Sequence, residues 1–366
     1  MKILYVTTIS LTMTFFVEHF KMLMNEGHEI ELACNFDSPL NKSVSDLNLV
    51  KHHIPFDRNP FSIQNVQAYK ELDKLISQEK YDVVHCHTPN ASVITRLVCK
   101  KYRKKGLKVF YTSHGFHFYK GAPIKNWVLY YPVEKLCSQW TDKLLTINHE
   151  DYNLAKNKFH AHEVIYIPGV GLDTKKFHKI NVDIKEERKS LGLDEKDFVL
   201  ISVGELNDNK NHQVIIKALS KMDDINVKYI IAGVGPNEKK LSELIISLHL
   251  ENQVKLLGYR NDVLLLYNLS DACCFPSIRE GLGMAALEGM ACGLPLIASD
   301  NRGVRDFCVN HSNGIVCRYN DEIEFKNAIS YLKNNKNIIE QMKTKNEKKV
   351  NEFDIKNTLS ILKNIY

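Results

Sequence analysis

The chain has 366 residues, of which 44% are apolar and 25% charged, and its formal net charge is +6. This length exceeds what one hydrophobic core usually serves, so two domains are expected, and the composition is that of a globular protein. The absence of a long apolar run argues against a transmembrane helix, and nine scattered cysteines without a CxxC pair indicate neither a disulfide framework nor a structural zinc site.

The first half of the chain alternates short apolar runs with amphipathic stretches. KILYVTTI predicts a buried strand, and FFVEHFKMLMNEG predicts a helix that ends at Gly27. The N-terminal segment lacks the long apolar core and the small-residue cleavage site of a signal peptide, so we expect a cytosolic protein. Further strands are predicted in EIELACN, YDVVHCH, KVFYTSH, KLLTIN and VIYIPG, with helices over residues 91–105 and 123–140.

The same rhythm restarts after the polar segment 175–198, which we interpret as a linker. Strands are predicted in FVLISVGEL, VKYIIAGVGP, QVKLLGY, DACCFPS, LPLIASD and GIVCRY. Alternating strands and helices indicate parallel sheets covered on both faces. The prediction is therefore an α/β protein with two doubly wound halves, residues 1–178 and 179–345. A last helix, 346–366, is expected to pack back toward the first half.

In open α/β sheets, ligands bind beyond the carboxyl ends of the strands, so two facing halves predict a cleft between domains. The strongest motif, PSIREGLGMAALEGMACGLPLIASD at residues 276–300, follows a strand and opens a helix. Its glycine-containing turn offers backbone amides and a positive helix end to phosphates. Glu280 and Glu288, eight residues apart, carry carboxylates that accept hydrogen bonds from vicinal hydroxyls of a sugar or ribose. The alternative for Glu288 is a carboxylate on the helix surface.

This motif resembles the signature of the retaining GT-B glycosyltransferases of family 4, which include bacterial polysaccharide enzymes, and the resemblance spans nearly the whole chain. It implies that Glu280 contacts the transferred sugar and that Glu288 contacts the ribose of the nucleotide. Tyr259 and Arg260, in GYRNDV, fall where the family's backbone reads the nucleobase. Residues assigned to donor binding in the turn are Gly281, Leu282, Gly283 and Met284.

The segment VGELNDNKNH departs from the family in one position. The family usually carries an arginine and then a lysine here, which clamp the diphosphate. This chain keeps Lys210 but has Glu205 in place of the arginine. Either another cation substitutes, with Arg279 or Arg302 as the candidates, or backbone amides hold one phosphate. Lys210 would stabilise the charge that grows on a leaving diphosphate, and its alternative is a solvent-exposed lysine.

In the first half, YTSHGFHFYKGAP places His114 where the family carries a histidine near donor sugar and acceptor, with His117 as a weaker candidate. His114 would hydrogen-bond a sugar hydroxyl and stabilise charge, or alternatively serve only as a structural residue at a strand end. The first loop has Met13 and Thr14 where many members have two glycines. Met13 and Thr14 are predicted to belong to a substrate-binding loop. Thr12 or Thr14 is predicted to cap the helix that follows.

Residues 85–143 hold eleven lysines and arginines but two acids, a net charge of +9. Such a patch attracts an anionic partner, and its alternative is a solvated helix face. Together with Phe118, Trp127, Tyr130 and Tyr131, it predicts peripheral contact with an anionic membrane, beside His114. The alternative for these aromatic residues, above all Tyr130 and Tyr131, is the core of the first half. No nucleic-acid-binding module is present.

The resemblance implies a front-face displacement with retention, in which the leaving phosphate accepts the acceptor's proton. No Asp-x-Asp metal clamp is evident, so no metal or other cofactor is expected. The donor is expected to be a UDP-sugar and the acceptor a polyprenyl-diphosphate-linked saccharide of capsule or exopolysaccharide assembly, at the inner face of the cell membrane. Two alternatives stay open: a nucleotide-sugar 2-epimerase, or an inactive nucleotide-sugar-binding protein.

Overall fold

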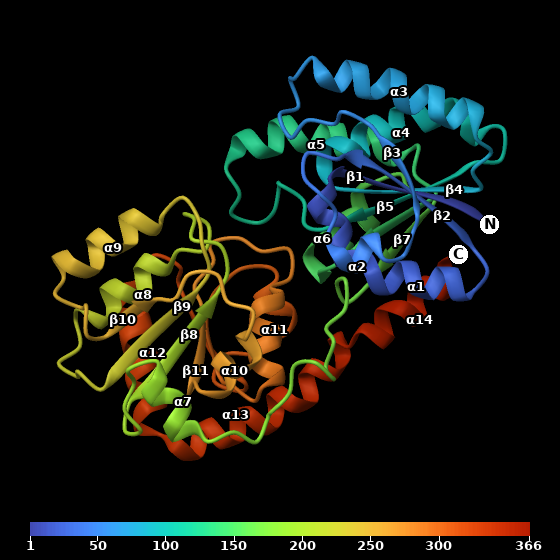
Figure 1. Cartoon of the computed structure of the whole chain (residues 1–366). Coiled ribbons are helices and arrows are strands. Elements are labelled where there is room, and N and C mark those ends of the chain that lie inside the picture. Colours follow the sequence, from blue (N-terminus) through green and yellow to red (C-terminus); the bar gives the residue numbers. More distant parts are fainter. The chain divides into compact units, whose positions relative to one another are not determined.

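A computed structural model describes all residues 1–366 and divides them into two compact units (Figure 1). Unit 1 comprises Met1–Gly171 together with Lys356–Tyr366, and unit 2 comprises Leu172–Ile355. The chain therefore passes from unit 1 to unit 2 a few residues before the predicted position, and it returns to unit 1 for its last residues.

Unit 1 is built on a parallel sheet of seven strands in the order β3-β2-β1-β4-β5-β6-β7. The order reverses between β1 and β4, whose central positions Tyr5 and His85 pair. A reversal of this kind leaves a crevice at the carboxyl ends of the two strands. The strands are β1 Lys2–Ile9, β2 Glu29–Asn35, β3 Val50–His53, β4 Val83–His87, β5 Lys108–Ser113, β6 Lys143–Thr146 and β7 Glu163–Tyr166. The sequence did not predict β3, a short edge strand with little buried surface.

Helices cover both faces of this sheet. α3 Gln64–Gln78, α4 Pro89–Arg103 and α5 Ile124–Ser138 form one layer, in which α4 packs against both neighbours (Figure 1). α4 buries Ala91, Ile94 and Val98, which share one helix face at helical spacing. The remaining helices are η1 Ser10–Phe16, α1 Val17–Asn25, α2 Lys42–Ser45 and α6 His149–Lys158. The expected threonine cap is wrong, because η1 continues directly into α1 and neither has a side-chain cap.

The last helix, α14 Ile355–Ile365, belongs to unit 1 from Lys356 onward. Leu362 and Ile365 are buried, and Lys363 pairs at 2.6 Å with Glu26, the residue that follows α1. The phenol of the final residue, Tyr366, hydrogen-bonds His85 and lies 3.1 Å from the hydroxyl of Tyr5. The C-terminal residue of the chain is thus part of the packing around β1 and β4.

Unit 2 repeats the architecture with a parallel sheet of six strands in the order β10-β9-β8-β11-β12-β13. Its order reverses between β8 and β11, where Leu200 pairs with Ala272. Both strands are buried on both faces, as their continuous apolar runs predict. The strands are β8 Phe198–Val203, β9 Val227–Ala232, β10 Val254–Leu256, β11 Ala272–Phe275, β12 Leu296–Ser299 and β13 Gly314–Cys317.

The helices of unit 2 begin within the segment predicted as a linker, where α7 Ile184–Ser190 forms. It is held by Arg188, whose guanidinium pairs with Asp271 at 2.8 Å and donates to the carbonyl of Leu269. The others are α8 His212–Leu219, α9 Glu238–Ser247, α10 Val263–Asn268, α11 Met284–Ala291, η2 Val304–Asp306, α12 Glu322–Asn334, α13 Lys336–Lys349 and η3 Val350–Phe353. None of the chain's helices combines the length and apolarity needed to cross a bilayer.

Candidate active site

The site in unit 2 lies beyond the carboxyl ends of β8 and β11, the two strands at the reversal of strand order. Lys210, in the loop after β8, forms an ion pair of 2.7 Å with the Oε1 of Glu280, in the loop after β11. Both side chains are only partly buried. The structure therefore joins two predicted residues that are 70 positions apart in sequence.

Backbone and amide contacts hold these two loops together. The Asn209 side chain donates to the carbonyl of Arg279 at 2.9 Å and accepts from its N–H at 3.2 Å, and the N–H of Ile278 donates to the carbonyl of Asn209. Asn211 donates to the carbonyls of Pro276 and Tyr319. These hydrogen bonds fix the backbone next to Lys210 and next to Glu280, and they thereby position both side chains.

Two glycines near the site stand at close contacts that leave no room for a Cβ. Gly233 has φ +157°, and a Cβ there would lie 1.9 Å from the carbonyl oxygen of Gly204. Gly283, the residue before α11, has φ +123°, and a Cβ would lie 2.9 Å from the ring of Phe275. A residue with a Cβ would fit at neither position without displacing the atoms that it meets.

The turn predicted to bind phosphate, residues 281–284, leads into α11, which begins at Met284. No side chain caps the first amides of this helix. A helix N-terminus without a side-chain cap presents N–H donors and a positive dipole end, which suit an anionic group. The turn and Glu280 share the loop after β11, and Lys210 reaches Glu280 from the loop after β8.

Glu288 lies in the second turn of α11, on the same helix that the phosphate turn opens. Burial raises the pKa of its carboxyl to about 7, against smaller lowering effects from the Tyr267 hydroxyl, Lys176 and Lys210. The Tyr267 hydroxyl donates to the carbonyl of Ala285 at 2.8 Å and lies 3.4 Å from Glu288 Oε2. Glu288 is therefore a half-buried carboxyl that titrates near neutral pH, not a solvated surface group.

The structure distinguishes the two arginines considered as substitutes for the missing cation. Arg302 is buried and its Nε donates to the carbonyl of Glu280 at 3.2 Å, so this guanidinium supports the turn from beneath. Arg279 is half-buried, and its backbone is held by Asn209. Glu205 is exposed, and its carboxylate accepts from the side chain of Asn207. Lys210 is the cation whose ammonium contacts Glu280 directly.

Tyr259 and Arg260 lie in the loop after β10, the edge strand that is separated from β8 by β9. Tyr259 is exposed, and Arg260 pairs with Asp262 at 2.7 Å. Their loop is joined to the others through the N–H of Gly233, which donates to the carbonyl of Gly258. No contact joins either side chain to Glu280 or Glu288.

In unit 1 the corresponding reversal lies between β1 and β4, and a histidine pair occupies it. His87, the last residue of β4, lies with its Nδ1 3.1 Å from the Nε2 of His114, which follows β5. The ring of Phe16 packs on His87 at 4.2 Å between centroids. Burial lowers the pKa of His114 to about 4 and lowers that of His87 well below its ordinary value, further helped by neighbouring histidines. Both imidazoles are neutral at pH 7, so His114 offers hydrogen bonds rather than a positive charge.

A second histidine of the same strand, His85, contacts Tyr366 and lies 2.8 Å from the hydroxyl of Thr112. Both ring nitrogens of His85 are therefore engaged within the protein. No group of three or more His, Cys, Asp or Glu side chains in the chain is arranged to hold a metal ion.

The loop after β1 forms the helix η1. Met13 is fully buried, so a ligand at this loop could meet its backbone but not its side chain. The hydroxyl of Thr14 is buried without a hydrogen-bond partner. The loop thus retains an unused polar group next to Phe16, which covers His87.

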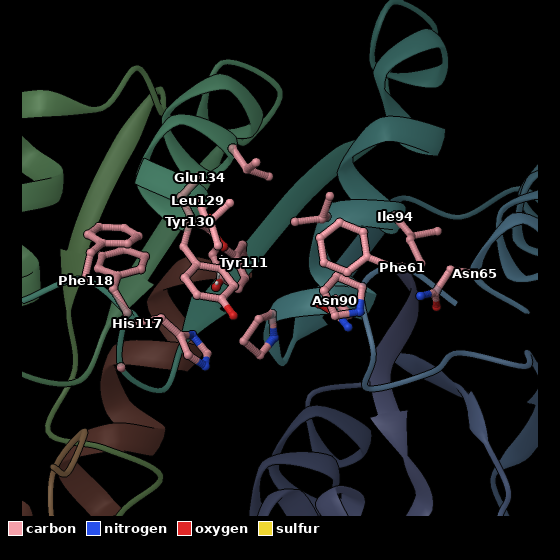
Figure 2. Close-up of a pocket in the computed structure, with 16 residues that line it drawn as sticks. Phe61, Asn65, Asn90, Ile94, Tyr111, His117, Phe118, Leu129, Tyr130 and Glu134 are labelled. Carbon is pink, nitrogen blue, oxygen red and sulfur yellow. Dashed lines mark hydrogen bonds between the residues drawn. The ribbon is translucent and has the colours of Figure 1, made fainter. Parts of the chain in front are cut away.

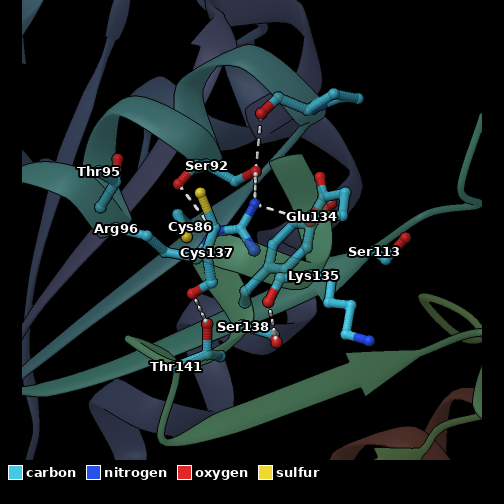
Figure 3. Close-up of polar contacts among 12 residues, drawn as sticks. Cys86, Ser92, Thr95, Arg96, Ser113, Glu134, Lys135, Cys137, Ser138 and Thr141 are labelled. Atoms are coloured by element: carbon cyan, nitrogen blue, oxygen red, sulfur yellow. Dashed lines mark hydrogen bonds and ion pairs between the residues drawn. The ribbon is translucent and has the colours of Figure 1, made fainter. Parts of the chain in front are cut away.

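The basic segment does not form one patch around His114, and that expectation is wrong. Arg96 is fully buried, where it pairs with Glu134 at 2.8 Å and stacks on Tyr111 (Figure 3), and Arg103 pairs with Asp142. Apart from Lys120 and Lys125, which follow His114 in sequence, the exposed lysines of the segment lie at the end of α4 and the start of β5, which is the amino edge of the sheet. The six residues of β5, about 20 Å of extended chain, separate that edge from His114. These lysines are Lys100, Lys101, Lys104, Lys105 and Lys108.

The aromatic residues of the same segment also lie elsewhere than predicted. Phe118 is fully buried, and Trp127, Tyr130 and Tyr131 pack against the core of unit 1. The large apolar side chains that α5 exposes are aliphatic, because its aromatic rings pack against the core. They are Ile124, Val128, Leu129, Val133 and Leu136.

Sequence reasoning missed two groups. Asn209 ties the two loops together, and nothing in its neighbourhood distinguishes it from other polar loop residues. Tyr366 contacts His85 across 281 positions, a pairing that no local pattern signals. Gly233 could have been found, because a glycine directly after a buried strand often marks a close backbone approach.

The geometry of unit 2 combines a cation, two carboxyls and a helix N-terminus at the reversal of strand order, and comparison with known proteins identifies the family of the chain. Residues 183–349 match the family described as glycosyl transferases group 1, and residues 2–148 match glycosyl transferase 4-like proteins. EpsD of Bacillus subtilis (strain 168), which carries a glycosyltransferase name, is 37% identical over 100% of this chain and 96% of its own length. The UDP-Gal:α-D-GlcNAc-diphosphoundecaprenol α-1,3-galactosyltransferase of Escherichia coli is 29% identical over 96% and 92% of the two chains.

Among solved structures, HepE of Anabaena in complex with UDP and glucose superposes with a TM-score of 0.82. It covers 100% of this chain and 99% of its own, at 18% identity. A likeness at this identity establishes the GT-B fold, with two parallel-sheet Rossmann-like domains. The chain therefore belongs to the glycosyl transferases group 1, and it is a glycosyltransferase of the GT-B fold.

Proposed function

We propose that the enzyme transfers a sugar from a UDP-sugar to a saccharide carried on a polyprenyl diphosphate, with retention of configuration, in the assembly of a surface polysaccharide. The observation that carries the donor assignment is the Lys210–Glu280 ion pair at the reversal of strand order in unit 2. The E. coli relative, named for a UDP-galactose donor and a diphosphoundecaprenol-linked acceptor, supports the choice of both substrates.

The residues divide the work of holding the donor. The amides at the start of α11 and the ammonium of Lys210 bind the diphosphate, and Glu280 accepts hydrogen bonds from hydroxyls of the sugar. Glu288 binds the ribose hydroxyls as an acceptor when ionised. As the bond between the anomeric carbon and the diphosphate oxygen breaks, negative charge grows on the diphosphate, and the fixed cation stabilises it.

The acceptor hydroxyl attacks the anomeric carbon from the face that the diphosphate leaves, and its proton passes to a phosphate oxygen of the leaving group. This step needs no protein base, so the protein contributes positioning and electrostatic stabilisation. His114, neutral at pH 7, acts as a hydrogen-bond partner for a sugar hydroxyl. We propose that no metal ion takes part, and activity in excess chelator is the expected result; loss that magnesium restores would overturn this.

We propose that the enzyme acts at the inner face of the cell membrane, attracted by the exposed lysines of α4. Near an anionic surface each lysine contributes about 1 kcal/mol. Sedimentation with anionic liposomes should be strong at low salt and weaken as salt rises. Replacing Lys100, Lys101, Lys104 and Lys105 with glutamine should release the protein without changing donor affinity. Equal pelleting of the quadruple variant and the wild type would show that these lysines are only a solvated helix end.

The donor assignment is tested by a thermal-shift screen against UDP-, GDP- and ADP-sugars. Stabilisation by UDP-sugars alone is expected, followed by transfer of labelled sugar to an undecaprenyl-diphosphate-linked saccharide. Free epimerised sugar formed without any acceptor would favour a 2-epimerase. Binding of the UDP-sugar with neither transfer nor slow hydrolysis would indicate an inactive binding protein.

A further inference from the structure

Unit 1 contains a cavity of about 340 Å³ that the donor and acceptor residues described above do not use. It lies between two walls (Figure 2). One wall is Phe61 with the first half of α4, and the other is α5 with residues 115–118 of the loop that follows His114. The volume lies in the usual range of small-ligand pockets, roughly 300–1,000 Å³.

The surface that lines this cavity is mainly apolar. In Figure 2, Phe61 and Ile94 on one wall face Leu129 on the other, and Val93 and Val133 belong to the same lining. The carboxylate of Glu134 reaches the cavity but is neutralised, because Arg96 donates to it at 2.8 Å and Tyr111 lies within 3.4 Å. A cavity whose charge is already paired favours an apolar ligand over a sugar or a nucleotide.

The amide of Asn90, also in the lining, is likewise occupied, since its Nδ2 donates to the carbonyls of Asp57 and Arg58. The polar groups of Glu134 and Asn90 therefore stabilise the protein around the cavity. Most of the remaining lining is apolar, with the rings of His117 and Tyr130 beside the aliphatic side chains.

The cavity opens onto an apolar face of the protein. Leu129 and Val133 line it while 54% and 41% of their surfaces remain exposed. Ile124, Val128 and Leu136 continue this face along α5 at helical spacing. Phe61, on the opposite wall, is 86% exposed. A contiguous exposed apolar surface of this kind marks a site of interaction with a lipid or a partner.

The surroundings of the cavity carry positive charge. Lys120 and Lys125 are exposed in the segment that joins the lining residues 115–118 to the first turn of α5. Arg58, whose carbonyl accepts from Asn90, is exposed on the other side. An occupant that matches both features has an apolar chain and an anionic end.

We propose that this cavity binds the first isoprene units of the acceptor's polyprenyl chain, with its phosphate end directed toward the cations at the rim. The inference rests on the proposed lipid-linked acceptor. The lining residues 115–118 follow His114 directly, so a chain held here has its saccharide end on the side of the sheet where His114 lies. The aliphatic face of α5 meets the membrane from which the chain enters.

The test measures binding of farnesyl phosphate, by calorimetry on the full-length protein without detergent. Wild type should bind it at least tenfold more tightly than inorganic phosphate and than a linear alkyl phosphate of matched chain length. Val93→Trp, which fills the cavity from α4, and Val133→Asp, which makes its partly exposed wall polar, should each weaken binding at least tenfold. Val93 is half-buried in the lining, and Val133 is exposed enough to accept a carboxylate without unfolding.

Val128→Asp is the matched control, because Val128 lies on the same exposed face of α5 but not in the lining. It should leave farnesyl phosphate affinity within about twofold of wild type. Unchanged affinity in both cavity variants would overturn the proposal, as would equal binding of inorganic phosphate. Equal binding of the linear alkyl phosphate would exclude an isoprenoid site. A failure of UDP-sugars to stabilise the protein would instead refute the proposed function, while the farnesyl phosphate result would stand separately.

Discussion

At the scale of single residues, the pairing of Lys210 with Glu280 has a chemical consequence. The ion pair holds the Glu280 carboxylate in one orientation, and Glu280 directly precedes the turn that we propose receives the diphosphate. The two side chains come from different loops, so each depends on the other loop for its position.

The first prediction concerns Glu280. Glu280→Ala removes the acceptor for the sugar hydroxyls and the partner of Lys210, so kcat should fall by roughly 10³-fold. The affinity for UDP should stay within about threefold, because the nucleotide contacts remain. Initial rates and calorimetry give the two quantities. Glu205→Ala, a carboxylate in the loop after β8 that contacts only Asn207, is the control and should keep wild-type turnover. Wild-type turnover in Glu280→Ala would remove it from the site.

The second prediction follows from the pKa of Glu288, which burial raises to about 7. The carboxyl is protonated below that pH, and only the ionised form accepts two hydrogen bonds from the ribose. The affinity for a UDP-sugar should therefore fall as pH drops below 7, by about tenfold per unit once the protonated form dominates. Calorimetry between about pH 5.5 and 8.5 measures this.

Glu288→Gln should bind UDP-sugar more weakly at pH 8 and with a flat pH profile. The free energy of unfolding of the unliganded protein changes with pH in the opposite direction from UDP-sugar affinity. Because the pKa of Glu288 is raised, this carboxyl stabilises the folded state at low pH, and the stabilisation is lost as pH rises through 7. The glutamine variant should therefore melt higher than wild type at pH 8. A pH-independent affinity in the wild type would contradict the role of the ionised carboxylate.

At the scale of elements, the start of α11 depends on glycine. Gly283 has φ +123°, and a Cβ there would press on the ring of Phe275 at 2.9 Å. Because Phe275 ends β11 and Gly283 opens α11, this contact sets the angle between strand and helix.

The third prediction is that Gly283→Ala destabilises unit 2 by about 2–4 kcal/mol, from backbone strain plus the clash, and weakens UDP-sugar binding. Gly258→Ala is the control, since its φ is +66° but no atom lies within 4 Å of the added Cβ. It should cost about 1 kcal/mol from strain alone. Urea unfolding of both variants measures the loss in free energy of unfolding. Equal losses in the two variants would mean that the ring of Phe275 moves aside without cost.

At the scale of the whole molecule, the chain leaves unit 1 at Gly171 and returns at Lys356, so unit 1 is complete only when the last helix has been added. The returning residues bury Leu362 and Ile365 and place Tyr366 against His85. Burial of each aliphatic side chain contributes about 1.5–3 kcal/mol.

The fourth prediction is that truncation after Ile355 destabilises unit 1 by several kcal/mol and makes it sensitive to proteolysis, while UDP-sugar still stabilises unit 2. Calorimetry with limited proteolysis measures both. Tyr366→Phe, which removes only the phenol contacts with His85 and Tyr5, should cost about 1–2 kcal/mol. A truncated protein as resistant to heat and protease as the full chain would show that the helix is dispensable.

Much of this architecture was predictable from local pattern. Buried parallel strands read as continuous apolar runs, which is why β8 and β11 were predicted, whereas the half-exposed β3 carries no such signal. Glu280 and Glu288 were predicted because a strand-to-helix turn with glycines has a recognisable local sequence, and Lys210 was predicted from the family resemblance of the segment VGELNDNKNH.

The sequence by itself determined two parallel-sheet domains, the order of their strands and helices, and the residues of the phosphate turn, because these follow from short-range periodicity and turn chemistry. Only the tertiary structure decided that Lys210 pairs with Glu280, that Tyr366 contacts His85, and that Arg96 is buried while the aliphatic side chains of α5 are exposed. These outcomes depend on contacts between distant segments. Which face of a helix meets the core is set by the neighbours packed against it, and no local pattern in α5 specifies them.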